Sequence, residues 1–181
     1  CVDTQEQIKC FDEACLNHAY PRSLLNTAGI IHYPEHHYEW IRPGVALYGA
    51  SPIDKRSADE LGLLPAMEVK AQVMAINRVG AGEKVGYEGS FVCGGDKLIA
   101  TVAMGYADGY PRAALNGTPT LLHEKICPLV GRVSMNMLCI DVSHLSGVKI
   151  GDWVTLWGGG LAIEQVARSA QSIPHDLMCG M

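Results

Sequence analysis

The sequence predicts two parts of different fold class, a short α/β segment followed by a mainly β domain. Three observations carry this prediction. The first third of the chain combines a helical apolar pattern with short apolar runs that end at proline or glycine. From about Pro65 onward, short β-like runs recur between Gly, Asn and Asp. An isolated α/β segment has too few βα units to close a sheet, so we expect it to complete a larger α/β domain lying upstream.

The α/β segment opens with a predicted helix over Gln5–Asn17, which Thr4 can cap. Pro21 prevents any helical continuation, and a second apolar run stops at Pro34. Residues 42–49 hold a third apolar run, which we expect to be a buried strand ending in glycine. The apolar face of the first helix would be formed by Ile8, Phe11, Ala14 and Cys15.

The β domain is predicted from a series of short apolar runs separated by turn residues, a spacing typical of a barrel or sandwich. One short helix is expected over Ile163–Ala170, because its apolar residues share one stripe. The predicted strands lie at Met67–Val79, Leu98–Met104, Thr118–His123, Pro128–Val130, Met137–Val142 and Trp153–Trp157.

Composition excludes several classes of protein. The 181 residues are 48% hydrophobic and carry a net charge of −5 without basic blocks, which argues against a nucleic-acid partner. No run approaches the ~20 apolar residues of a membrane span, and no signal peptide opens the chain. The seven cysteines form no C-x-x-C pair, which favours a reducing compartment such as the cytoplasm. Because the chain begins with Cys1 instead of Met, we expect a processed start or a piece of a longer protein.

The residues with chemical potential are tyrosines between glycines and arginines in apolar surroundings. Tyr87 and Tyr106 each follow a glycine, where the backbone can approach a ligand closely. Ordinary turns explain either tyrosine alone. Arg42 and Arg132 adjoin apolar runs, where structural ion pairing and ligand contact are both open. No metal site, P-loop, G-x-G-x-x-G or G-x-S-x-G motif is present.

Taken together, these residues resemble those of bacterial alanine racemases. Each motif is weak by itself, but five of them occur in the family's order and near its spacing, over essentially the whole chain. The motifs are Asn26-Thr-Ala, Ile41-Arg-Pro-Gly-Val45 with Leu47-Tyr-Gly49, Val85-Gly-Tyr87, Gly105-Tyr-Ala-Asp-Gly109 and Val130-Gly-Arg-Val-Ser-Met135.

The resemblance implies an N-terminal (β/α)8 barrel, similar to a TIM barrel, that holds pyridoxal 5'-phosphate, then a β domain, in a head-to-tail homodimer. Residues 1–55 would be the C-terminal end of the barrel, 56–64 a linker and 65–181 the β domain without its last strand. The implied reaction interconverts L-alanine and D-alanine for peptidoglycan. The family's cofactor-bearing lysine lies in an earlier segment that is absent here, so we expect this chain alone to be inactive.

The resemblance also implies roles for the residues that bind the cofactor. Thr27, Gly44 and Val45 match the phosphate cradle, and His175 stands where a phosphate-contacting tyrosine is usual. Arg42 matches the arginine that faces the pyridine nitrogen, where a guanidinium has no proton to give readily.

A second group of residues would surround the small amino-acid substrate. Tyr87 matches one of the two proton-transferring residues, reaching in from the partner subunit, and the lysine is the other. Tyr106 and Met135 match substrate-side residues of the partner, and Arg112 and Arg132 match arginines of the access corridor.

Four residues depart from the family pattern and leave alternatives open. Thr27 replaces serine, Glu88 replaces glycine, Asn136 replaces aspartate and His175 replaces tyrosine. The change at His175 keeps open a racemase for another small amino acid, such as serine. Basic amino-acid decarboxylases share the architecture, but their acidic-cysteine motif is not found. A non-catalytic β-barrel binding module is the alternative of another class, and a lysine in an upstream barrel would exclude it.

Overall fold

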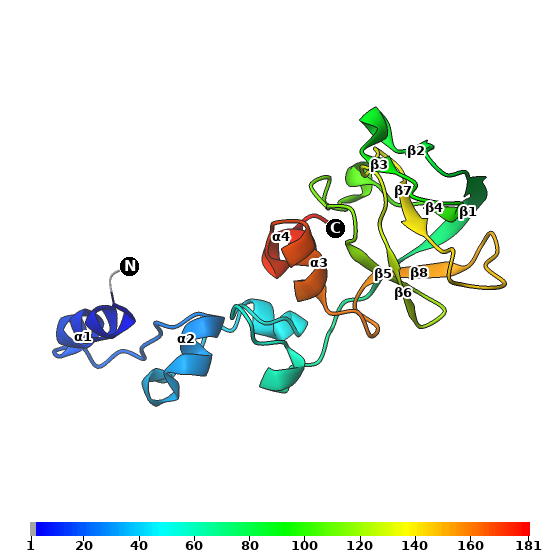
Figure 1. Ribbon diagram of the computed structural model, residues 1–181. Helices are drawn as coiled ribbons and strands as arrows, with labels where there is room; N and C mark the ends of the chain where they lie inside the picture. Colours follow the sequence, from blue (N-terminus) through cyan, green and yellow to red (C-terminus); the bar gives the residue numbers. More distant parts are fainter. Residues whose placement is uncertain (1–2) are drawn as a thin grey trace.

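The computed structural model describes residues 3–181, so Cys1 lies outside the described residues. An arm carrying helices α1 (Thr4–Cys15) and α2 (Thr27–His32) extends from a compact part built of strands (Figure 1). Helices α3 (Ile163–Ser169) and α4 (Pro174–Cys179) lie between the root of the arm and the strands. Within residues 3–181, no helix is long and apolar enough to cross a bilayer.

The expected first helix exists, but its bounds and cap differ from the prediction. The Asp3 carboxylate, one residue before Thr4, accepts a hydrogen bond from the Gln5 N–H at 3.1 Å and caps the helix. The helix ends at Cys15, and Ile8 is the one residue of its predicted apolar face that is buried. The run before Pro34 is also helical, as α2, followed by the 3₁₀ turn η1 (Pro34–His36).

The prediction of a buried strand within residues 42–49 is wrong, because this run forms the 3₁₀ turn η2 (Val45–Tyr48). Pro43 has no N–H to give a strand ladder, and Gly49 takes a left-handed φ of 71°, so the run closes into one turn. Val45 is buried, whereas the Leu47 and Tyr48 side chains are exposed. Periodicity alone cannot assign so short an apolar run.

The strands form a six-stranded antiparallel sheet that nearly closes on itself in the order β6-β5-β8-β1-β4-β7. A bridge between Leu129 and Ile140, with the Val130 N–H donating to the Cys139 carbonyl at 2.9 Å, brings β6 to β7. The strands are β1 (Val69–Val79), β4 (Lys97–Val102), β5 (Pro119–Leu122), β6 (Lys125–Pro128), β7 (Leu138–Asp141) and β8 (Trp153–Trp157). The barrel-like β domain is therefore confirmed.

Two details of the β domain were not predicted. β6 begins at Lys125, three residues before the expected strand, because His123 and Glu124 take left-handed φ values of 49° and 61° and make a tight two-residue turn after β5. The short strands β2 (Lys84–Val85) and β3 (Phe91–Val92) pair as a separate hairpin. Two-residue strands leave no alternation that a sequence pattern can detect.

The core lies inside the sheet and beneath its two C-terminal helices. Along β1, Ala71 and Val73 are buried, as the two-residue period of a strand requires. Trp157 is fully buried and stacks on Tyr110, with ring centroids 5.9 Å apart. Ile163 and Val166 of α3 are buried in this core. This buried core carries the loops at the end of the β domain that lies away from the arm.

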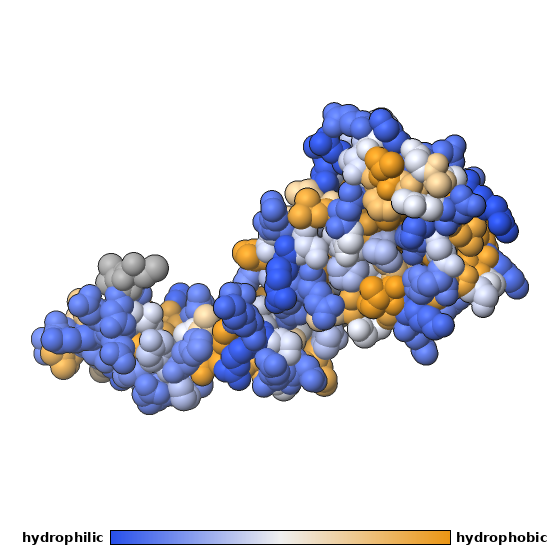
Figure 2. All heavy atoms as spheres, in the orientation of Figure 1, coloured by the Kyte–Doolittle hydropathy of each residue, from blue (hydrophilic) through white to orange (hydrophobic). Residues whose placement is uncertain are grey.

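The arm is much less buried than the β domain, and Figure 2 shows hydrophobic residues on its surface. Leu16, Tyr20 and Trp40 are 77%, 79% and 66% exposed. Local opening is easiest where few apolar groups are buried. We therefore expect hydrogen exchange to be fast over the described part of 1–55 and slow over 67–157. Mass spectrometry of exchanged peptides measures this, and equal protection of both regions would contradict the two-part description.

Candidate active site

On the arm, α2 and η2 meet at a buried hydroxyl. Asn26 caps α2, so Thr27 begins that helix and is only 4% exposed. Its Oγ1 accepts a hydrogen bond from the Ala46 N–H at 3.4 Å, at the first turn of η2. A Cβ placed on Gly44 would meet no atom within 4 Å, so the space in front of this turn is open. The arrangement offers a hydroxyl and backbone amides to an anion.

Arg42 lies just before this turn and turns its guanidinium toward the backbone. Its Nη2 donates to the Leu24 carbonyl, which fixes the arginine against the segment that leads into α2. Arg42 and Gly29 both line a hollow of about 490 Å³ on the arm. Arg42 thus contacts a backbone carbonyl and also borders this hollow, where a ligand contact stays a prediction.

At the far end of the β domain, Tyr87 stands on a loop of unusual backbone conformation. Gly86 has a φ of 80°, and a Cβ placed there would lie 2.8 Å from the backbone nitrogen of Arg132. The loop therefore packs directly on the backbone of the strand-to-strand segment that carries Arg132. The Tyr87 side chain is 69% exposed and free to meet a ligand from outside its own chain.

The segments that carry Tyr106 and Met135 are joined by backbone hydrogen bonds. The Tyr106 N–H donates to the Ser134 carbonyl at 3.0 Å, and the Ala107 N–H donates to the Met135 carbonyl at 2.8 Å. A Cβ on Gly105 would lie 2.3 Å from that Met135 oxygen, so only glycine permits this approach. The two segments form one rigid unit.

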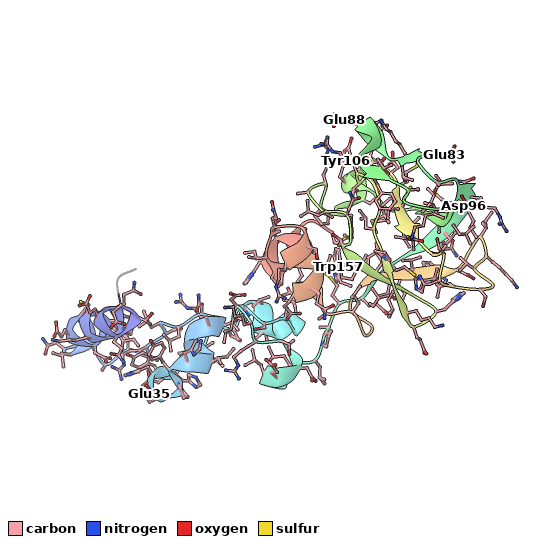
Figure 3. The ribbon with its side chains drawn as sticks, viewed as in Figure 1. Glu35, Glu83, Glu88, Asp96, Tyr106 and Trp157 are labelled. Carbon is pink, nitrogen blue, oxygen red and sulfur yellow. The ribbon has the colours of Figure 1, made fainter. Side chains whose placement is uncertain are left out.

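Arg112 completes this side of the domain. Its guanidinium carbon lies 5.9 Å from the centre of the Tyr106 ring, within cation–π range. Thus five residues, four of them from three separate motifs, gather at one end of the β domain, and we call them the tyrosine cluster. Figure 3 shows Tyr106 at this end, far from the arm. The members of the tyrosine cluster are Tyr87, Tyr106, Arg112, Arg132 and Met135.

His175 belongs to neither group of residues. It is an exposed residue in the first turn of α4 and lines a groove with Ser51, Arg168 and Ser172. Within one chain, the structure does not bring the arm residues Thr27, Gly44 and Val45 to the tyrosine cluster (Figure 1). A single chain therefore presents two incomplete halves of the predicted site.

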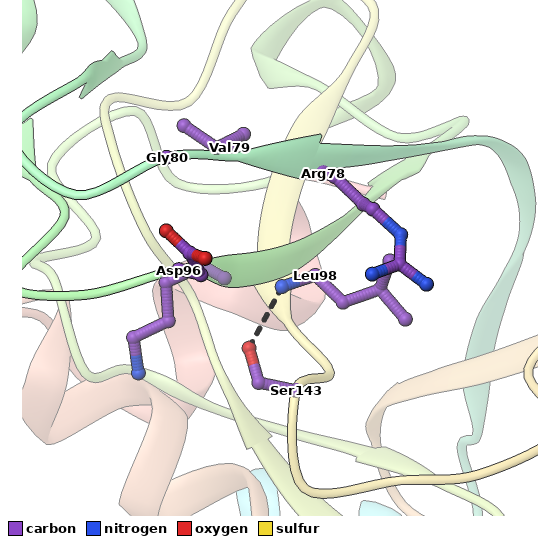
Figure 4. Close-up of a pocket in the computed structure, with 7 residues that line it drawn as sticks. Arg78, Val79, Gly80, Asp96, Leu98 and Ser143 are labelled. Atoms are coloured by element: carbon purple, nitrogen blue, oxygen red, sulfur yellow. Dashed lines mark hydrogen bonds between the residues drawn. The ribbon is translucent and has the colours of Figure 1, made fainter.

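Another hollow, shown in Figure 4, lies along β1 and β4 and contains none of the predicted site residues. Lys97 pairs with Asp141 at 2.7 Å, and the Ser143 hydroxyl accepts the Leu98 N–H at 2.8 Å. Burial would raise the pKa of Asp141, but hydrogen bonds from Lys97 and Ser143 lower it below its usual value. The polar groups beside this hollow are ion-paired or hydrogen-bonded to one another, which is typical of a structural network.

Models of known protein families match both parts of the chain. A family model described as "Alanine racemase, C-terminal domain" matches residues 66–181, and one described as "Alanine racemase, N-terminal domain" matches residues 2–52. The chain belongs to the alanine racemase family. The predicted fold class is confirmed with it, as the C-terminal part of a fold-type III protein.

Individual alanine racemases agree with this assignment. The protein from Thioalkalivibrio sulfidiphilus is 46% identical over 99% of this chain and 50% of its own length, and the biosynthetic enzyme of Escherichia coli is 40% identical over 98% and 50%. The crystal structure of the biosynthetic alanine racemase from Pseudomonas aeruginosa is 43% identical, with a TM-score of 0.91 over 97% of this chain and 49% of that one. The chain spans about half the length of the curated relatives it matches.

One solved relative bears on the cofactor. The alanine racemase of Bartonella henselae, 29% identical with a TM-score of 0.86 over 99% of this chain and 50% of that one, is described with covalently bound pyridoxal phosphate.

Two contacts at the tyrosine cluster of this alanine racemase chain were missed from the sequence. Glu88 forms an ion pair with Arg132 at 3.0 Å. The Asn116 amide accepts the Gly131 N–H at 2.6 Å and donates to the Ser90 carbonyl at 2.9 Å. The replacement of glycine by Glu88 was a signal for the first contact. Nothing local in the sequence marks Asn116.

Proposed function

We propose that the full-length protein interconverts L-alanine and D-alanine with pyridoxal 5'-phosphate as its cofactor. Family membership supports the reaction class. The observation that carries the proposal is the tyrosine cluster, since two phenols and two guanidiniums from distant parts of the sequence gather at one end of the β domain. The neighbouring loops hold these groups through backbone contacts, which suits a site that must fix proton donors in place.

The arm residues fit the phosphate of the cofactor. The buried hydroxyl of Thr27 and the backbone amide of Val45 would hold it at the start of η2, where Gly44 leaves open space while its own N–H donates to the Arg42 carbonyl at 2.9 Å. When bound, the cofactor supplies an electron-accepting ring that acidifies the substrate's Cα–H. Arg42 would face the ring nitrogen and leave it unprotonated, because a guanidinium stays charged and gives up no proton.

Tyr87 would transfer the proton on one face of the substrate's Cα, and a lysine from the upstream barrel would serve the other face. Arg112 and Arg132 are the cationic side chains of the tyrosine cluster; Arg112 lies over the Tyr106 ring and Arg132 is paired with Glu88. Tyr106 and the backbone of Met135 would orient the substrate.

The two halves of the site call for a second copy of the chain. The residues proposed for the cofactor lie on the arm and those proposed for the substrate lie at the far end of the β domain. We propose a head-to-tail homodimer in which each tyrosine cluster meets the partner's cofactor site. This arrangement assigns 1–55 to the barrel, 56–64 to the linker and 65–181 to the β domain. We also propose that the D-alanine serves peptidoglycan synthesis and that the enzyme works in the cytoplasm.

Serine is the second candidate substrate, because the polar, exposed His175 stands where the family has tyrosine. We expect the full-length enzyme loaded with cofactor to racemise L-alanine with a kcat/KM about tenfold or more above that for L-serine, since a pocket shaped for a methyl group discriminates weakly but measurably against an added hydroxyl. Chiral chromatography of the products measures both rates.

His175→Tyr is the matched variant for the substrate test, and it should increase the preference for alanine. A faster reaction with L-serine would replace alanine by serine as the substrate. Turnover of neither amino acid would favour the non-catalytic binding module.

A further inference from the structure

Glu88, directly after Tyr87, has a backbone conformation that glycine would adopt more easily. Its φ is 59° and its ψ is 8°, between Gly86 and Gly89, which also have positive φ. The carboxylate lies 3.0 Å from Nη1 of Arg132 (Glu88 is labelled in Figure 3). The structure therefore shows a charged contact at a point where the backbone alone would favour glycine.

The Tyr87 loop is tied to the Arg132 segment by two side-chain contacts. One is the neutral bridge of Asn116, which joins Gly131 to Ser90. The other is the ion pair of Glu88 with Arg132. Both contacts lie on the C-terminal side of Tyr87, since Glu88 lies within the 3₁₀ turn η4 (Tyr87–Gly89) and Ser90 follows it.

The same segment also holds the other substrate-side residues. Its Ser134 and Met135 carbonyls accept hydrogen bonds from the 3₁₀ turn η5 (Tyr106–Asp108) at 3.0 and 2.8 Å. Asp108 closes that turn by accepting the Gly105 N–H at 2.9 Å. Tyr106 is thus fixed to the Arg132 segment by backbone hydrogen bonds, whereas the Tyr87 loop is held there by the close packing of Gly86 and by the two side-chain contacts.

We propose that Glu88 is a positioning residue that holds the Tyr87 hydroxyl in register with Tyr106 and Met135 through its ion pair with Arg132. This rests on the proposed function of Tyr87 in proton transfer. Without the pair, the packing of Gly86 on Gly131 and the Asn116 bridge at Ser90 still hold the loop, but Glu88 loses its contact with the Arg132 segment. Proton transfer on the Tyr87 face then slows, and transfer on the lysine face does not.

The expected effect is modest and sensitive to salt. The side chains of Arg132 and Glu88 are 47% and 72% exposed, and ion pairs so exposed contribute little and are screened. We expect Glu88→Gln, which keeps the side-chain shape and removes the charge, to slow the exchange on the Tyr87 face about two- to fivefold. Added salt should slow the native enzyme toward the variant and leave the variant unchanged.

The experiment measures deuterium exchange into each alanine enantiomer from D₂O, with the full-length holoenzyme. Glu124→Gln is the matched control, because Glu124 is also exposed, has a φ of 61° and lies in the turn between β5 and β6. The control should leave both exchange rates unchanged. The double variant Glu88→Gln/Arg132→Gln should lose no more than Arg132→Gln alone, as two partners of one contact would.

Three results would overturn the inference. The first is a Glu88→Gln variant with the same exchange rates as Glu124→Gln. The second is an equal slowing on both faces or a change confined to KM, which would mean that Glu88 masks Arg132 from the incoming substrate. The third is additive loss in the double variant. Tyr87→Phe is measured alongside: if it loses no exchange on either face, the proposed base itself fails, whereas a normal loss there with a silent Glu88→Gln removes the Glu88 inference alone.

Discussion

Replacing Tyr87 by phenylalanine in the full-length enzyme should lower the racemisation rate by about 10²–10⁴-fold, the range typical of a lost general acid–base group. The substitution removes one hydroxyl from a side chain that is 69% exposed, so the β domain should keep its fold. The lysine on the other face should still exchange its proton. We therefore expect deuterium from solvent to enter one enantiomer without inversion, as nuclear magnetic resonance of the recovered alanine would show.

Two further tyrosines make this test specific. Tyr106→Phe should cost less, because Tyr106 is assigned to positioning, and its backbone contacts with Ser134 remain. Tyr20→Phe is a matched control on the arm, where the ring stacks on His18 and is 79% exposed, and it should have no effect. Loss of exchange in Tyr106→Phe with a nearly silent Tyr87→Phe would reverse the two assigned roles.

The second large effect concerns the 181-residue chain expressed as it stands. Mixed with pyridoxal phosphate and L-alanine, it should form no D-alanine, because we propose that the cofactor-bearing lysine belongs to an upstream segment. Among the described residues, Lys9, Lys70 and Lys97 pair with Glu13, Glu68 and Asp141, and no lysine lines the hollow beside Arg42. Chiral chromatography and mass spectrometry after borohydride treatment measure turnover and cofactor attachment.

The full-length enzyme is the positive control for this result. A stoichiometric, borohydride-trapped attachment of the cofactor to the 181-residue chain, accompanied by racemisation, would contradict the assignment of the missing base to an upstream segment. Trapping at scattered surface lysines without turnover would not contradict it, since exposed amines react with aldehydes without forming a site.

Secondary structure could be predicted where a segment was long and regular. In β1, buried and exposed residues alternate from Lys70 to Met74, and in β8 every residue after Trp153 is buried. Helix α3 buries its apolar residues Ile163 and Val166. The errors came at short segments. The run at Val45–Tyr48 became a 3₁₀ turn because Pro43 and Gly49 constrain the backbone on both sides, and β6 began early because two left-handed residues set the turn before it.

Local patterns and ordered motifs were enough to predict the fold class, the family and a set of candidate site residues. Which of these residues come into contact could be seen only in the folded chain. The segments of Tyr106 and Met135 are joined by backbone hydrogen bonds, one of which runs from Ala107 to Met135, and Glu88 pairs with Arg132 although the two are far apart in the chain. Such contacts depend on how the β strands pair in the nearly closed sheet, and local residue propensities do not determine that pairing. The arm and the tyrosine cluster stay apart within one chain, because the arm extends away from the end of the β domain that carries the cluster.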